Sequence, residues 1–412
     1  MSDLQQDDPA VSLAGTVFEA QIDKVAHGGH CVTRYAGRVV FVRHALPGET
    51  VRVQITAGQP GDRFLLGDAV EVLTASEHRV VPRCRFAGPG RCGGCDWQHS
   101  ELSYQRELKA AVIAEQFKRL AGLDVDVRVE ALPGDVEGTR WRTRTEFAID
   151  ANGAAGLHPH HSHEVIPVDD CLISTERVIS TGVLDRLWPS TRSVDVVDAS
   201  GEPRAVTVPL PQGDAAVPYV TERVETGEWS AEFRLSARGF WQVHPGAAAT
   251  YVTHVLSELA PAAGERAMDL YSGVGLFAVA LADAVGPAGA VLAIESDGRA
   301  VRDAKSNLRH RPEIELRRGK VDRVLKPLVR QGIRTDLVVL DPPRTGAGKS
   351  VIRDVAALGP RAVAYIACDP AALARDVAYA RDAGYGIRTL RAFDAFPMTH
   401  HVECVAVLEP LS

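Results

Sequence analysis

The chain has 412 residues, of which 45% are apolar and 24% charged. This composition is ordinary for a globular protein and leaves room for two or three domains. The net charge of −7 argues against attraction of the whole chain to nucleic acid, although the basic runs at 140–144 and 317–334 leave a local basic face open. No run of eighteen apolar residues is present, and the acidic start "MSDLQQDDPA" does not resemble a signal peptide, so a cytoplasmic protein without a membrane span is expected.

Residues 1–75 are expected to form the first domain, a small β-barrel. Apolar and polar positions alternate between turn signals over residues 14–75. The stretch "GRVVFVRHALPGETVRVQI" predicts two strands joined by a Pro-Gly turn, and "LLGDAVEVLT" predicts another. Several short strands so close together indicate a barrel.

Residues 76–245 are expected to form a second, β-rich domain that includes one helix near 102–120. Seven cysteines, so clustered in a chain of this length, argue against a disulfide framework and favour metal-binding or catalytic thiols in a reducing compartment. Four of them could hold zinc or an iron–sulfur cluster, and their spacing does not choose between the two. The candidate metal ligands are Cys84, Cys92, Cys95 and Cys171.

From about residue 246 to 412 strands and helices alternate, which predicts a third domain with a parallel sheet covered by helices on both faces. Ligands of such sheets bind beyond the carboxyl ends of the strands. In "DLYSGVG" two glycines, Gly273 and Gly275, follow a strand that carries Asp269, and Glu295 ends the next strand. An acid, a glycine pair and a second acid favour a class I S-adenosylmethionine (SAM) methyltransferase over a nicotinamide enzyme, because the third glycine of the dinucleotide motif is missing.

The stretch "YIACDP" places Cys368 where a buried strand gives way to a helix. A buried structural cysteine is the usual interpretation, but at this position the backbone N–H groups and the helix dipole could stabilise a thiolate. A thiolate that adds to carbon 6 of uracil makes carbon 5 nucleophilic towards a methyl sulfonium. A general base must then remove the proton on carbon 5. Glu403, beside an apolar run that should raise its pKa, is the candidate base, whereas Cys404 is expected to be a core residue.

Together, "FWQVHP", "DLYSGVGLF", "LDPPRTG", "YIACDP" and "FPMTHHVECVAVL" resemble the RNA uracil-5-methyltransferase family, which makes 5-methyluridine in transfer and ribosomal RNA. The resemblance covers nearly the whole chain. It implies a Rossmann-like SAM domain, with Cys368 as the nucleophile and Glu403 as the base. It assigns to the SAM site Gln242, Tyr271, Gly273, Gly275, Glu295, Asp322 and Asp341. Leu276 and Ser272 depart from the Asn and Cys that are frequent in the family.

The same resemblance concerns the two amino-terminal parts. Residues 1–75 are similar to the TRAM domain, an OB-like RNA-binding barrel, with candidate RNA contacts at Arg34, Tyr35, Arg38, Phe41 and Arg43. Members with this cysteine set carry a [4Fe–4S] cluster, which favours iron–sulfur over zinc. The histidine-rich "HPHHSHEV" is expected near RNA rather than at a metal. TRAM plus cluster cysteines favour 23S ribosomal RNA as the substrate and leave transfer RNA open.

Two other functions stay open on the sequence. A SAM enzyme that acts on another carbon or base would not need Cys368 for a covalent adduct. A non-catalytic RNA-binding protein would have no use for both Cys368 and Glu403. The sequence indicates neither the uridine modified, nor a protein partner, nor an oligomeric state.

Overall fold

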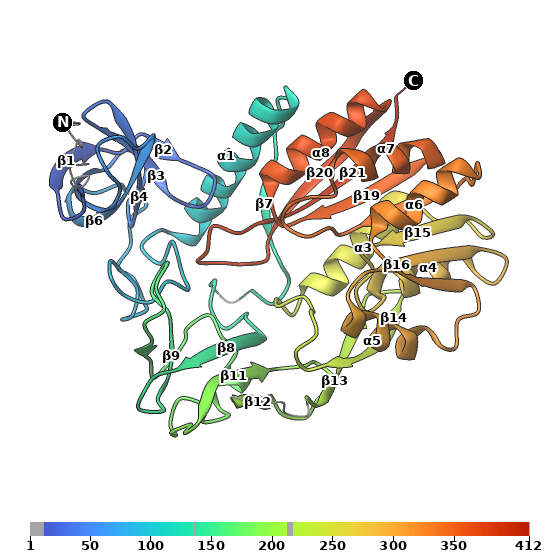
Figure 1. Ribbon diagram of the computed structural model, residues 1–412, viewed down its shortest axis with the longest axis horizontal. Coiled ribbons are helices and arrows are strands. Elements are labelled where there is room, and N and C mark those ends of the chain that lie inside the picture. Colours follow the sequence, from blue (N-terminus) through green and yellow to red (C-terminus); the bar gives the residue numbers. More distant parts are fainter. Residues whose placement is uncertain (1–11, 136, 212–216, 412) are drawn as a thin grey trace, which may run out of the picture.

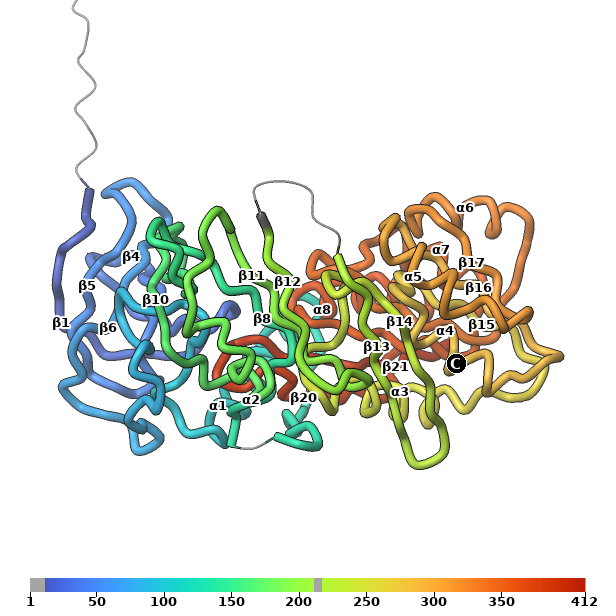
Figure 2. Tube along the Cα trace, turned by 90° about the horizontal axis from the view of Figure 1, so that it is seen from below, coloured from blue at the N-terminus to red at the C-terminus, as the bar shows by residue number. Residues whose placement is uncertain are grey.

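The computed structural model describes residues 12–135, 137–211 and 217–411. The sequence "PQGD" (211–214) predicts a turn, but most of it lies outside these ranges. The amino-terminal barrel occupies one end of the molecule and the α/β part the other, with the β-rich middle region beside both (Figures 1 and 2). Within the described ranges, no helix combines the length and the apolar character needed to cross a bilayer.

The amino-terminal sheet has six strands in the order β1-β5-β6-β4-β3-β2. Its strands are β1 (Val17–Gln21), β2 (Lys24–Val25), β3 (Cys31–Tyr35), β4 (Arg38–Arg43), β5 (Thr50–Ala57) and β6 (Phe64–Thr74). In β5, buried Val51, Val53 and Ile55 alternate with exposed Arg52 and Gln54. This period of two forms the barrel core, so the predicted barrel is confirmed.

The middle region contributes both to sheets of its own and to the large carboxy-terminal sheet. Its five-stranded sheet has the order β10-β9-β8-β11-β12, and β13 and β14 form a separate hairpin. The bounds are β8 (Arg144–Ile149), β9 (Ala155–Leu157), β10 (Ile166–Pro167), α2 (Glu176–Ile179), β11 (Thr191–Val197), β12 (Val206–Pro211), β13 (Tyr219–Glu225) and β14 (Ser230–Ser236). By contrast, α1 (Leu102–Ala121) packs on α8 and β7 (Val129–Ala131) pairs with β20, both of the carboxy-terminal part. The boundaries at 75 and 245 stay predictions.

The large sheet has eight strands in the order β17-β16-β15-β18-β19-β21-β20-β7. They are β15 (Arg266–Leu270), β16 (Ala290–Glu295), β17 (Ile314–Arg318), β18 (Leu337–Leu340), β19 (Ala362–Ala367), β20 (Tyr385–Asp394), β21 (Glu403–Pro410) and β7. The first five strands in this order are parallel, whereas β21 is antiparallel to both β19 and β20. The Rossmann-like architecture is confirmed, but the expectation of a wholly parallel sheet is wrong for β21.

Helices cover both faces of this sheet. On one face lie α3 (Ala247–Leu259), α4 (Leu276–Val285) and α5 (Gly298–Leu308), and on the other lie α1, α6 (Val321–Arg330), α7 (Gly348–Leu358) and α8 (Pro370–Asp382). Alternate residues of each buried strand join the two hydrophobic cores: in β19, Ala364 and Ile366 face α3, whereas Val363 and Tyr365 face α8. Strands buried on both faces are apolar throughout, which explains the unbroken apolar runs in the sequence.

Candidate active site

Strand alternation places four polar side chains on one face of the sheet. Val339 of β18, Ile366 of β19 and Val405 of β21 belong to the core on the α3 side. Continuing the alternation by two residues puts Asp341, Cys368 and Glu403, respectively, on the same side. In β15, Asp269 is two residues from Ala267 of that core and is fully buried. The candidate nucleophile, the candidate base and two further acids therefore share one face at one edge of the sheet.

Cys368 and Glu403 lie across from each other on neighbouring strands. Ala367 of β19 pairs with Cys404 of β21, so the next step of this antiparallel register sets Cys368 opposite Glu403. Opposed residues of an antiparallel pair carry their side chains on the same face, at short range. Because β21 is antiparallel, its first residue, Glu403, meets the carboxyl end of β19. This reversal brings the predicted base to the edge where the predicted nucleophile lies.

The carboxyl of Glu403 has the raised pKa expected from the sequence. Glu403 is buried, and burial followed by the charge of Asp341 raises its pKa well above the ordinary value. Burial likewise raises the pKa of Asp341, and it raises that of Asp269 to about 8. A group with a raised pKa accepts a proton readily near neutral pH, as a general base must.

The thiol of Cys368 behaves differently from the expectation. Burial, then the charges of Glu403 and Asp341, raise its pKa to about 11, so the expected stabilisation of a thiolate by the following helix is wrong for the structure described. In addition, Asp369 caps α8 with its own carboxylate, which accepts a hydrogen bond from the Ala372 amide at 2.7 Å. Arg344 is the one cation among the main influences, and it lowers the pKa of Cys368.

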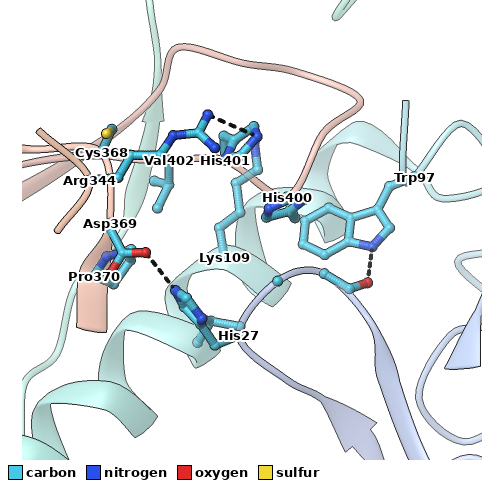
Figure 3. A pocket seen from close by; sticks show the side chains of 13 residues that line it. His27, Trp97, Lys109, Arg344, Cys368, Asp369, Pro370, His400, His401 and Val402 are labelled. Atoms are coloured by element: carbon cyan, nitrogen blue, oxygen red, sulfur yellow. Dashed lines mark hydrogen bonds and ion pairs between the residues drawn. The ribbon is translucent and has the colours of Figure 1, made fainter. Parts of the chain in front are cut away.

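A pocket of about 200 Å³ lies beside Cys368, between the barrel and the large sheet (Figure 3). Its walls come from the loop after β2, from the loop before α1, from α1 itself and from the ends of β18, β19 and β21. The lining residues are His27, Gly28, Gly29, Trp97, Lys109, Val112, Arg344, Cys368, Asp369, Pro370, His400, His401 and Val402. The barrel thus supplies part of the wall beside the predicted nucleophile.

Three contacts hold the barrel loop against this pocket. His27 Nε2 lies 3.0 Å from Asp369 Oδ2, and this hydrogen bond raises the pKa of His27. Trp97 Nε1 donates to the Gly29 carbonyl oxygen at 3.0 Å. A Cβ on Gly29 would lie 2.4 Å from the Cβ of His400, so only glycine permits this approach. Neither His27 nor Gly29 was singled out from the sequence, where "HGGH" is the only local signal.

Tyr251 of α3 completes the buried group and was also missed by the sequence analysis. Its side chain is fully buried, and its ring centroid lies 5.6 Å from that of Phe393, the register partner of Glu403. Burial and the charges of Glu403 and Asp341 raise the pKa of its hydroxyl well above the ordinary value. That hydroxyl has no hydrogen-bond partner among the described residues. Nothing in the local sequence distinguishes this tyrosine from an ordinary core residue.

The predicted SAM residues of β15 and β16 lie together at the same edge. Gly273 and Gly275 have φ of 55° and 100°, the left-handed region that favours glycine. A Cβ on Gly273 would meet no atom within 4 Å, which leaves space for a ligand. The Glu295 carboxylate accepts hydrogen bonds from the amides of Gly273 and Asp297 at 2.9 and 2.7 Å. An acid held beside a glycine turn suits ribose hydroxyls.

The other predicted cofactor residues are placed around these two strands. Tyr271 follows β15 with a φ of 65° and packs towards α6, where the charge of Asp322 contributes to its raised pKa. Gln242 lies, half-buried, in the segment before α3. Of the two positions that depart from the family pattern, Leu276 begins α4, whereas Ser272 is buried with an unpartnered hydroxyl.

A buried network fixes the loop that follows Asp341. Asp376 of α8, which is fully buried, accepts hydrogen bonds from the amides of Ala347 and Gly348 at 2.7 and 3.0 Å, and from the Tyr365 hydroxyl at 2.7 Å. This loop carries Arg344 to the pocket. The network therefore connects the stability of α8 to the position of the pocket's cation.

Replacing Asp376 by alanine is expected to lower the free energy of unfolding by about 2 kcal/mol, because the Gly348 amide and the buried Tyr365 hydroxyl lose their acceptor. The Ala347 amide keeps only its hydrogen bond to the Tyr365 hydroxyl, at 3.1 Å. The matched control, Tyr365→Phe, removes the hydrogen bond that the hydroxyl donates to Asp376 and the one that it accepts from the Ala347 amide. It should cost about 1 kcal/mol, because both amides still donate to Asp376. Urea unfolding followed by circular dichroism measures both. Equal losses for the two variants would contradict the network.

The four candidate metal ligands come together at the junction of the middle region and the barrel. The charges of Cys84, Cys92 and Cys171 all raise the pKa of Cys95, after burial, so the four thiols lie close enough to interact. Two of the sulfurs accept hydrogen bonds, at 3.4 Å from the Gly94 amide and at 3.5 Å from Gln98 Nε2. Within the described ranges, no three Cys, His, Asp or Glu side chains are arranged to hold a single metal ion.

The expected barrel contacts are partly confirmed as accessible. Arg34 is exposed, and Tyr35, Arg38, Phe41 and Arg43 are half-buried. Phe41 packs edge-to-face with Phe64, with ring centroids 5.5 Å apart. Cys31 is a core residue of the barrel, since it is 1% exposed. Cys404 is fully buried on the face opposite Glu403, which confirms its assignment to the core.

Comparison with known proteins agrees with this geometry. Residues 215–410 match the family described as tRNA (Uracil-5-)-methyltransferase, and residues 11–70 match the TRAM domain. An uncharacterized RNA methyltransferase of Streptomyces avermitilis is 49% identical, with 96% of this chain and 99% of that one covered. Another, of Bifidobacterium longum, is 38% identical over 94% of this chain and 96% of its own length.

A solved structure shares the fold. The tRNA (uracil-54, C5)-methyltransferase of Pyrococcus abyssi, determined in complex with S-adenosyl-L-homocysteine, superimposes with a TM-score of 0.68 at 20% identity. The match covers 95% of this chain and 99% of that one. It therefore includes the barrel and the middle region as well as the large sheet.

Proposed function

Because the chain belongs to the RNA uracil-5-methyltransferase family, we propose that it methylates carbon 5 of a uridine in RNA, through a covalent bond between Cys368 and carbon 6. The observation that carries this proposal is the register of β19 and β21, which sets Cys368 opposite Glu403 at the carboxyl edge of the sheet. A thiol and a carboxyl with a raised pKa, side by side in a SAM-type fold, are the two groups that this reaction requires.

The reaction divides between the two side chains. The Cys368 sulfur, once deprotonated, forms a bond to carbon 6 and pushes the electrons of the 5,6 double bond towards carbon 5. Carbon 5 then takes the methyl group. The Glu403 carboxylate accepts the proton of carbon 5, the double bond re-forms, and the bond between sulfur and carbon 6 breaks. The uridine must be unstacked, since carbon 6 is blocked within a helix.

S-adenosylmethionine is the methyl donor that we propose, and it supplies an electrophilic methyl group. Gly273 and Glu295 fit its ribose end, because Gly273 leaves open space beside a carboxylate, and Gly275 is proposed to complete the turn. Asp341 lies between this turn and Glu403 along the sheet. Gln242, Tyr271 and Asp322 are proposed to line the remainder of the site.

A [4Fe–4S] cluster is the group that we propose for Cys84, Cys92, Cys95 and Cys171. The resemblance to family members with this cysteine set supports the proposal, and the thiols lie close enough to influence the pKa of Cys95. Hydrogen bonds to sulfur are typical of such clusters. Four thiolates can also hold zinc, so zinc is the alternative. The reaction itself needs no electron, so the cluster would stabilise the middle region.

Cys95→Ser is expected to lower the iron content and the visible absorbance of the anaerobically purified protein, and to lower its melting temperature, because a buried ligand is lost. The control Cys31→Ser removes a thiol from the barrel core and should leave the iron content unchanged. Iron and sulfide analysis measures the difference. A Cys95 variant with full iron content and unchanged stability would contradict the assignment.

We propose 23S ribosomal RNA as the substrate, on the combined resemblance of the barrel and the cysteine set. The experiment that tests the function maps 5-methyluridine in ribosomal and transfer RNA from cells with and without this gene. Loss of one 5-methyluridine from 23S RNA supports the proposal. Loss from transfer RNA alone would show that transfer RNA, and not ribosomal RNA, is the substrate. No loss from either would refute uridine methylation of these RNAs.

A further inference from the structure

Positive charge is concentrated in one short part of this acidic chain. Residues 298–334 contain twelve Lys and Arg but four Asp and Glu, whereas the whole chain has a net charge of −7. This segment forms α5, β17 and α6, which make up one lateral end of the large sheet. That end lies far from the barrel in both views (Figures 1 and 2).

Five exposed cations of this segment, here called the basic rim, surround the carboxyl ends of β16 and β17. Two belong to the first two turns of α5, which follows β16; one ends β17; and two lie at the start of α6. They are Arg299, Arg302, Arg318, Lys320 and Arg323. Strand ends and the starts of the helices that follow them share one edge of a parallel sheet. The basic rim is therefore on the same edge as Cys368 and Glu403.

The cations of the basic rim are not held in ion pairs within the described part of the chain. None of the five residues forms an ion pair there, although Arg311 and Arg317 of the same segment pair with Asp283 and Glu315. Two acids are nearby: Asp297, whose carboxylate caps α5 and whose pKa is lowered by the capping hydrogen bonds and in part by the charges of Arg299 and Arg302, and Glu295, the register partner of Arg318.

Two guanidinium groups of the rim also converge. The position of a Cβ on Gly298 would be 3.0 Å from Arg318 Nη2 and 3.9 Å from Arg302 Nη1. Like charges gathered in this way repel unless an anion lies between them.

We propose that the basic rim binds phosphate groups of the substrate RNA beyond the target uridine. The inference rests on the proposed function, because it takes the anion to be the RNA that reaches Cys368. The RNA-binding barrel lies at the other end of the molecule, so an RNA bound by both must extend along the whole enzyme. The substrate is then a folded RNA much larger than the loop that carries the uridine. Exposed arginines without carboxylate partners are suited to phosphates.

The test compares charge reversals at the two ends of the sheet. Arg302→Glu/Arg318→Glu should weaken binding of a 23S RNA transcript or a full transfer RNA transcript about tenfold, and should lower the slope of log affinity against log salt by about 2. Binding of a short oligouridylate, which does not reach the rim, should be unchanged. SAM affinity, measured by calorimetry, should also be unchanged.

Arg128 provides the matched control. It is exposed, has no ion pair within the described ranges, and precedes β7 at the opposite end of the same sheet. Arg128→Glu should leave affinity and salt slope at wild-type values, and Arg318→Glu alone should lower the slope by about 1.

Equal effects of Arg318→Glu and Arg128→Glu, unchanged binding of the long RNAs, or an equal loss with the oligouridylate would each overturn the inference. The wild-type enzyme could methylate none of these RNAs while the rim variants still weaken binding of the long ones. In that case the proposed reaction is wrong, but RNA binding by the basic rim is supported.

Discussion

Cys368→Ala is expected to abolish covalent complex formation with RNA that contains 5-fluorouridine, and to reduce methyl transfer on the order of 10⁴-fold or more. The reason is that Cys368 is the one described cysteine on the face of the sheet that carries Glu403. Fluorine at carbon 5 cannot be removed as a proton, so the wild-type enzyme should stop as a stable adduct. A shifted band in denaturing gels measures the adduct, and incorporation of labelled methyl groups measures the rate.

Cys404→Ala is the matched control for this experiment. Its sulfur is adjacent to Glu403 in sequence but lies in the core on the opposite face of the sheet. The variant should lose some stability, because a buried thiol is replaced by a smaller side chain, yet it should keep adduct formation. An adduct that persists in Cys368→Ala, or disappears in Cys404→Ala while the protein stays folded, would contradict the choice of nucleophile.

The raised pKa of Cys368 has a consequence for when the thiolate forms. With a pKa of about 11, the thiol is protonated near neutral pH in the structure described. The charges of Glu403 and Asp341 contribute to this, so a positive group bound near these carboxylates would lower the pKa of Cys368. The sulfonium of the proposed methyl donor is such a group. The thiolate would then form only when the donor is bound. Without the donor, the thiol would stay protonated.

Much of the fold could be predicted because its signals are local. The apolar run of β19, the glycine turn after β15 and the alternation in β5 each specify their element without reference to distant residues. Cys368 and Glu403 could be chosen because each adjoins a buried strand, where a reactive group stands out. Their mutual position follows from the antiparallel pairing of β21, which strand patterns alone do not reveal.

Other features depend on tertiary contacts and left no pattern in the sequence. The three residues of β7 form a strand because they pair with the edge of β20. The sequence pattern, by contrast, places them in the middle domain. His27 and Asp369 meet although 342 positions separate them. The place of Cys368 before a helix predicts a stabilised thiolate, but burial, followed by the charges of two carboxyls from β18 and β21, raises its pKa. Contacts of this kind are visible only once the sheet order is known.

Glu403→Gln is expected to allow methyl transfer but to trap the covalent complex, with release of product slowed by 10² to 10⁴-fold, a typical contribution of a general base. The amide keeps the size of the side chain and cannot accept the proton of carbon 5. Rapid quenching followed by denaturing gels should show methylated RNA attached to the enzyme. Because burial and Asp341 raise the pKa of Glu403, release by the wild-type enzyme should accelerate with rising pH as this carboxyl loses its proton. In Glu403→Gln this dependence should vanish.

Glu49→Gln separates this effect from the loss of any buried carboxylate. Glu49 is fully buried in the barrel, where it pairs with Arg79. Its replacement should lower stability, since Arg79 loses its partner, while the covalent complex should not accumulate. If Glu403→Gln turned over at the wild-type rate, or accumulated no methylated adduct, another group would have to remove the proton. The partly buried Asp341, whose pKa is also raised, would be the next to test.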